Sequence, residues 1–186
     1  DAGARLCERI GRLDHTPANP GMPEDEYKVG YIGTSRGNLY QGEEDIVAQV
    51  RGYMDDSDAS NIGRVGHRRW CLNPAMLKTG FGRSGRFGAM YAHDGSRRGS
   101  PDVEYVAYPA PGWMPDYYFA PHYAWNVSLS QRRFSKPDPG KVKITVRPIG
   151  ADHVRRDPPI QLENVKVSIE GMGMPYCLIF RPQGIS

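Results

Sequence analysis

The sequence predicts a mixed α+β protein with its helices in the first half and a β-rich second half. Three observations lead to this fold class. Apolar residues recur at helical spacing in residues 2–13 and 43–56. Glycines alternate with larger residues from 80 to 88, as in a tight hairpin. After about residue 95, β-branched and aromatic runs alternate with Pro, Gly and Asp turns. We therefore expect one domain at 1–95 and a β-rich, sandwich-like extension at 96–186 packed on it.

The sequence patterns that predict helices differ in how clear they are. Residues 2–13 place Leu6, Ile10 and Leu13 on one helical face. "EEDIVAQVRGYMDD" is the clearest amphipathic helix, and its opening acids suit the positive end of the helix dipole. A helical turn near 67–72 should end before Asn73-Pro74. Residues 14–42 are rich in Pro, Gly, Asn and Asp, which predicts a long ordered loop with one short helical turn near "PEDEY".

The predicted strands follow the hairpin "TGFGRSGRFGAMYAHD". Val142, Ile144 and Val146 alternate with Lys and Thr, which is typical of a half-buried strand. "IQLENVKVSIEG" and "YCLIFRP" are further strand candidates, and no helix is expected in this half.

Composition limits the function classes. The chain has 186 residues, and 24 basic against 21 acidic residues give a net charge of +3, too small to indicate nucleic-acid binding. No apolar run approaches the roughly 20 residues that span a bilayer. The three cysteines lack C-x-x-C spacing, which argues against a thiolate zinc site. One disulfide plus a free thiol and three separate buried thiols both remain open. "NVS" at Asn126 matches the glycosylation acceptor pattern, which gives weak support for an exported protein.

Histidines are the candidate chemical groups. None of the five lies in an H-x-x-x-H or H-E-x-x-H pair, so a metal site would have to combine distant segments. A lone histidine is more often a packed residue than a ligand. His15 and His67 stand out because each lies beside loop residues next to a strong helix.

Several motifs together resemble one known family. "DHTP" at 14–17, "RGNLYQG" at 36–42, the helix "EEDIVAQVRGYM" and "GHRRWCLNPAMLKTGFG" at 66–82 occur in that order. This arrangement resembles the CAP superfamily, the domain of cysteine-rich secretory proteins, antigen 5 and plant pathogenesis-related proteins, over residues 4–92. The resemblance implies a CAP-like α-β-α sandwich with an open cleft, an extracellular or cell-surface location, and a first helix upstream of Asp1.

The resemblance also implies a site of two histidines and two acids, in which some members hold a divalent metal. His15 and His67 match the two histidines. Gly37 stands where the family has a glutamate, and Asp56 is the candidate for the second acid, with Asp55 or Asp58 as substitutes. Since a carboxylate beside an imidazole orients the ring and supports a metal, its loss at Gly37 favours a degenerate cleft. No cofactor is therefore expected, with zinc at His15 and His67 as the alternative.

Two surface features leave alternatives open. The arginines around the motif are either an anion-binding patch or a solvated, partly salt-bridged face; the second is favoured, and they are Arg64, Arg68, Arg69, Arg83, Arg86, Arg97 and Arg98. The run 108–125 is either a packed connector, which we favour, or a stacking platform for sugars or a proline-rich partner. The candidate ligand-binding residues are Asn38, Trp70, Trp113, Tyr117 and Tyr118.

Three functions follow. The first is a non-enzymatic extracellular or cell-surface CAP-like module that acts in binding or surface assembly. Its partner would be a protein or another copy, with glycan or lipid as other ligands, and neither a nucleic-acid partner nor a transmembrane segment is expected. The second is a metal-dependent hydrolase or peptidase that uses His15 and His67 with Asp56. The third is a binder of an anionic ligand, either glycan or nucleic acid.

Overall fold

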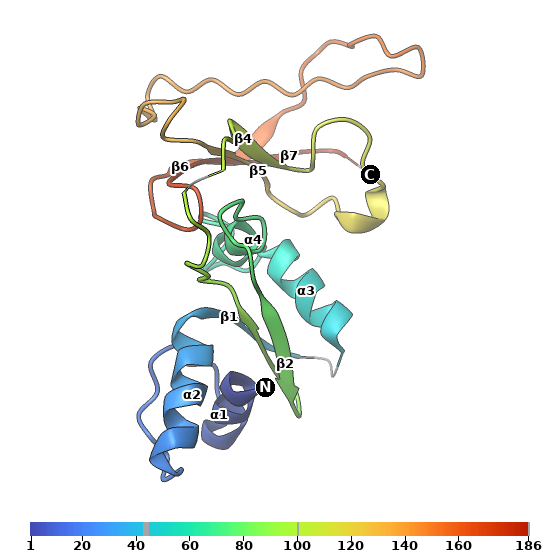
Figure 1. The fold of residues 1–186 in the computed structure, drawn as a ribbon. Helices are drawn as coiled ribbons and strands as arrows, with labels where there is room; N and C mark the ends of the chain where they lie inside the picture. Colours follow the sequence, from blue (N-terminus) through green and yellow to red (C-terminus); the bar gives the residue numbers. More distant parts are fainter. Residues whose placement is uncertain (43–44, 100, 186) are drawn as a thin grey trace. The chain divides into compact units, whose positions relative to one another are not determined.

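The computed structural model describes residues 1–42, 45–99 and 101–185 and confirms a mixed α+β protein (Figure 1). The chain forms two compact units. Unit 1 comprises Asp1–Met54 and Trp70–Pro101, and unit 2 comprises Asp55–Arg69 and Asp102–Ser186. The predicted division at 95/96 differs from this one in two segments: it assigns residues 55–69 to the N-terminal part and residues 96–101 to the C-terminal part.

Unit 1 contains more regular structure than the sequence predicts. Helix α1, Ala2–Ile10, confirms the first predicted helix. The helical turn predicted near "PEDEY" is the start of helix α2, Glu24–Ser35, but the long loop predicted around it is wrong, since α2 continues to Ser35 and strand β1, Gly37–Gln41, follows. Helix α2 lacks a clear apolar stripe, but its glycines allow close packing on α1: a Cβ added at Gly33 would lie 2.9 Å from the backbone of Gly3. Tertiary packing thus selects a helix that the local pattern does not reveal.

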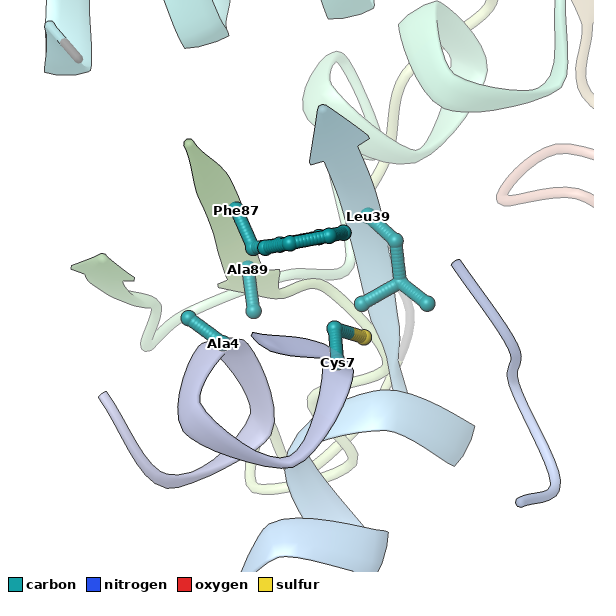
Figure 2. Close-up of a cluster of buried hydrophobic side chains, with 5 residues drawn as sticks. All are labelled: Ala4, Cys7, Leu39, Phe87 and Ala89. Atoms are coloured by element: carbon teal, nitrogen blue, oxygen red, sulfur yellow. The ribbon is translucent and has the colours of Figure 1, made fainter. Parts of the chain in front are cut away.

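The sheet of unit 1 has the order β1-β3-β2 and is antiparallel. Strands β2, Gly80–Ser84, and β3, Phe87–Tyr91, form the predicted hairpin, with Gly85 at a φ of 52° in the turn. Helix α1 packs on one face through a buried cluster, shown in Figure 2, of Ala4, Cys7, Leu39, Phe87 and Ala89.

Helix α3, Ile46–Asp55, confirms the predicted amphipathic helix. Its acidic start at Glu43 and Glu44 lies outside the described residues, but the Asp45 carboxylate accepts hydrogen bonds from the backbone N–H groups of Val47 and Ala48. The Tyr53 hydroxyl donates to the carbonyl of Asn38 in β1 at 2.9 Å. Gly88 of β3 faces Gln49 of α3, whereas its neighbour Ala89 faces α1. Because successive strand residues point to opposite faces, helices cover both faces of this sheet.

Unit 2 is built on a four-stranded antiparallel sheet of order β4-β5-β7-β6. Its strands are β4, Tyr105–Tyr108, β5, Trp125–Leu129, β6, Leu162–Ser168, and β7, Tyr176–Pro182. The 3-10 turn η1, Asp116–Tyr118, precedes β5. The buried core of unit 2 contains Val65 from the segment 55–69, Ala124, which precedes β5, and Cys177 and Ile179 of β7.

The strand predicted at 142–146 is wrong as regular structure. Only Val146 forms a bridge, to Ile160. The alternation in burial nevertheless holds, because Val142, Ile144 and Val146 are half-buried while the residues between them are exposed.

The cysteines are all free thiols. Cys7 and Cys177 are buried and Cys71 is partly buried, which decides between the two alternatives in favour of separate thiols. Burial raises the pKa of the Cys7 and Cys177 thiols. Among the described residues, no helix combines the length and apolar character needed to cross a membrane.

Candidate functional site

His67 is held by an aspartate within unit 2. Its Nδ1 lies 2.7 Å from Asp56 Oδ1, and Asp56 Oδ2 accepts the backbone N–H of Arg68 at 3.1 Å. The Asp56 side chain is buried, and its backbone adopts a left-handed φ of 50°. Because a carboxylate only accepts hydrogen bonds, Nδ1 carries the proton, and in the neutral ring the lone pair is on Nε2. This arrangement suits a base or metal-ligating histidine, and it equally anchors the first turn of α4, Gly66–Cys71.

The two substitute acids have other contacts. Asp55 Oδ1 lies 3.5 Å from His122 Nε2. Asp58 fixes its own loop by accepting hydrogen bonds from Ser60 and Asn61. Partial burial opposes ionisation of Asp58, but these hydrogen bonds outweigh it and lower its pKa. Of the three candidate acids, Asp56 is therefore the one that contacts His67.

The arginine after His67 belongs to the interior of unit 2. Arg68 is 0% exposed. Its guanidinium donates to the carbonyl oxygens of Ala124 and Asp55 and, at 3.1 Å, to Asn126 Oδ1. Its Cζ lies 4.6 Å from the Tyr108 ring centroid. Burial lowers the Arg68 pKa, while the Asp56 carboxylate opposes that shift. The prediction of a solvated arginine face is wrong for Arg68.

Arg69 is buried in the same way. Its guanidinium donates to the Glu170 and Met174 carbonyl oxygens and to the Ser168 hydroxyl. These partners lie in β6 and the loop that follows it, so Arg69 ties α4 to the edge of the unit 2 sheet. The Gly-His-Arg-Arg motif thus supplies two internal cross-links, and neither arginine is available to an external anion.

His15 lies in unit 1, where its Nδ1 donates to the carbonyl of Thr34 at 2.8 Å. A carbonyl only accepts, so this contact also leaves the ring's lone pair on Nε2 when the ring is neutral. Since His15 and His67 belong to different units, their pairing stays a prediction.

A second histidine of unit 1 was not predicted as a functional residue. The ring of His93 stacks on Trp70, with centroids 4.0 Å apart. Burial lowers the His93 pKa, and the charges of His15 and Arg36 add to this effect. No sequence spacing links Trp70 and His93, because Trp70 lies in α4 whereas His93 follows β3.

Gly37 has no room for a side chain. A Cβ at this position would lie 2.6 Å from the carbonyl oxygens of both Gly33 and Met90, much closer than van der Waals contact. Both obstacles are backbone atoms of α2 and β3, which cannot move aside as a flexible side chain can. The position that the resemblance assigns to a glutamate therefore cannot carry one in this fold.

Two other candidates are internal residues. Asn38 is buried, and its Nδ2 lies 3.4 Å from Cys71 Sγ, so its side chain does not face an external ligand. Asn126 is buried in β5, with its Oδ1 bound by Arg68. A glycan on the Asn126 amide would need space in the packed interior, so this placement argues against glycosylation there.

The aromatic loop, residues 109–118, carries the most exposed rings. Trp113 is 88% exposed, Tyr117 70% and Tyr118 60%, so these rings are not buried as in the favoured packed connector. The loop itself is held in place, since the Tyr108 hydroxyl donates to the Tyr118 carbonyl. The Tyr117 and Tyr118 rings meet edge to face at 5.5 Å. Trp113 makes a similar contact with His153 at 5.5 Å.

The grouping of possible metal ligands bears on the zinc alternative. Among residues 1–42, 45–99 and 101–185, no three His, Cys, Asp or Glu side chains are grouped so that they could hold an ion. Since Gly37 also excludes its acid, the residues present do not fit the family's four-residue site. Comparisons of the chain with family models, curated proteins and solved structures found no significant match.

Proposed function

We propose that this chain is a non-enzymatic CAP-like module of the cell surface or the extracellular space, and that it binds its partner through the aromatic loop. The observation that carries the proposal is the exposure of Trp113, Tyr117 and Tyr118 on one anchored loop. Exposed aromatic rings supply a large contact area at a small entropy cost, and isolated monomers rarely leave several of them side by side.

The layers of unit 1 support the CAP-like part of this proposal. Helices cover both faces of a three-stranded antiparallel sheet, which agrees with the sandwich that the resemblance implies. The binding role is supported by the motif residues themselves. Arg68 and Arg69 stabilise unit 2, Asp56 caps α4, and Gly37 cannot carry the acid of the family site.

The test compares binding by the wild type with binding by a Trp113→Ala/Tyr118→Ala variant. The probes are an array of neutral and acidic glycans and, for self-assembly, sedimentation velocity over a range of protein concentrations. We expect the variant to lose binding or self-association at least about tenfold, because interface aromatics of this size often contribute 2 kcal/mol or more. Phe81→Ala, which truncates a partly exposed ring in unit 1, is the matched control. Unchanged binding and assembly in the double variant would refute the proposal.

The second candidate is a metal-dependent hydrolase or peptidase, favoured by the 2.7 Å contact between His67 Nδ1 and Asp56 Oδ1. Zinc content measured by mass spectrometry, together with hydrolysis of peptide and ester substrates, distinguishes the two functions. Stoichiometric zinc and activity that both disappear in His67→Ala would establish the hydrolase and remove the proposal of a non-enzymatic module.

A further inference from the structure

Basic charge is concentrated in one segment of unit 2, residues 131–160, which we call the basic arm. The arm has eight Lys or Arg and three Asp residues, a net charge of +5, while the whole chain carries +3. The remaining residues therefore carry a net charge of −2. Figure 1 shows much of the arm, in orange, extending from the four-stranded sheet as two adjacent stretches of chain.

The outer part of the arm is an irregular hairpin held by backbone hydrogen bonds. The N–H of Ile160 donates to the Val146 carbonyl at 2.8 Å, and that of Arg156 donates to the Pro148 carbonyl at 2.9 Å. The turn is closed by the bond from the Gly150 N–H to the Val154 carbonyl at 2.9 Å. The arm therefore has a defined backbone path that can hold its side chains in order.

Exposed and half-buried residues alternate along the first part of the hairpin, and this alternation places several cations in a row. Lys141, Lys143, Thr145 and Arg147 are exposed, while the residues between them are half-buried. Extended residues two apart lie about 6–7 Å from each other, so the ammonium and guanidinium groups form a line rather than a patch. Three cations on one side of an extended stretch, Lys141, Lys143 and Arg147, suit the repeating charges of an extended polyanion.

These cations are available to a ligand. Among the described residues, no ion pair involves Arg132, Lys136, Lys143 or Arg155, while the arm's other four cations form exposed pairs with aspartates. Exposed ion pairs contribute little to stability, so their cations can change partners readily. A polyanion could therefore replace the aspartates without a large cost.

An exposed aromatic ring lies at the end of this line. His153, in the turn of the hairpin, contacts Trp113 edge to face, and Trp113 is 88% exposed. The line of cations therefore ends beside a flat apolar ring that could stack on a sugar face.

We propose that the basic arm and Trp113 bind a linear acidic polysaccharide with carboxylate or sulfate groups. This inference rests on the proposed binding function and names its partner. Single-stranded nucleic acid fits less well, since it needs an aromatic ring for successive bases and the row carries none. An anionic bilayer fits less well because the turn, where Ile149 and Val154 are exposed, also carries Asp152.

Isothermal titration calorimetry with heparin and with alginate tests the proposal, using Lys143→Glu/Arg155→Glu and the control Arg97→Glu/Arg98→Glu. Both variants change the net charge by the same amount, and the control residues are exposed in unit 1. We expect the arm variant to bind at least about tenfold more weakly and the control to change less than about twofold. Wild-type affinity should fall about tenfold or more between about 50 and 200 mM salt. Circular dichroism confirms that both variants fold.

Three outcomes would overturn the proposal: no binding of either polymer, equal weakening in both variants, or tighter arm-dependent binding to poly-dT or to phosphatidylglycerol vesicles. Trp113→Ala should weaken polysaccharide binding and leave its salt dependence unchanged, because the ring carries no charge. If the arm variant binds normally while Trp113→Ala/Tyr118→Ala loses its partner, the arm inference fails and the proposed function stands.

Discussion

Replacing Arg68 with Ala should destabilise unit 2 strongly. The side chain is fully buried, and its removal leaves three acceptors without their donor: the carbonyls of Ala124 and Asp55 and the Oδ1 of Asn126. Each buried polar group left unsatisfied costs about 1–3 kcal/mol. Water that enters the new space offsets part of this cost, so we expect a loss of about 3–5 kcal/mol in the free energy of unfolding, as for a broken buried ionic network.

Urea unfolding followed by far-ultraviolet circular dichroism and tryptophan fluorescence measures this loss. If the two units unfold in separate transitions, the midpoint of the transition of unit 2 should shift to a lower urea concentration. Arg68→Lys keeps the charge but offers fewer donors, so its loss should be smaller, at about 1–3 kcal/mol. Arg97→Ala, at an exposed site, should stay within about 0.5 kcal/mol. A loss below about 1 kcal/mol in Arg68→Ala would refute a structural role and restore the anion-binding interpretation.

Three further predictions concern unit 1 and β5. The folded-state pKa of His93 lies below its unfolded value of about 6.5, so the unfolded state takes up the proton first and stability falls as pH drops below about 6.5. His93→Gln should show a smaller decrease in melting temperature between pH 7.5 and 5.0, and an unchanged decrease would contradict this assignment. Gly37→Ala should lower stability by about 1–3 kcal/mol in urea unfolding, since its Cβ meets two backbone carbonyls; a neutral effect would show that the site can relax. Protein secreted from a glycosylating host should carry no glycan mass on Asn126 in intact-mass spectrometry, and a modified, folded protein would contradict the burial argument.

The strongly periodic helices could be predicted from the sequence, and so could the β2–β3 hairpin. Only the first turn of helix α2, near "PEDEY", could be predicted, because the glycines of the helix serve the contact with α1 and weaken the local helical signal. The alternation at 142–146 predicted burial correctly but not strand pairing, since pairing depends on a partner segment that local sequence does not specify.

Part of the candidate site was also predictable. The resemblance assigned His67 and Asp56 to one site, and in the structure their side chains are in contact. The burial of Arg68 and Arg69 was not predictable, because arginine side chains are usually on the surface. The charge of the basic arm is visible in the sequence, but the whole-chain value of +3 understates it because the remaining residues carry a net charge of −2.

Hydrogen–deuterium exchange with and without heparin tests the central claim most directly, because it locates the ligand on the folded chain. The account predicts slower exchange in the aromatic loop at 109–118 and in the hairpin of the basic arm at 141–157, with no change around His15 and His67. Protection confined to the segments around His15 and His67, with the loop and the arm unaffected, would contradict it.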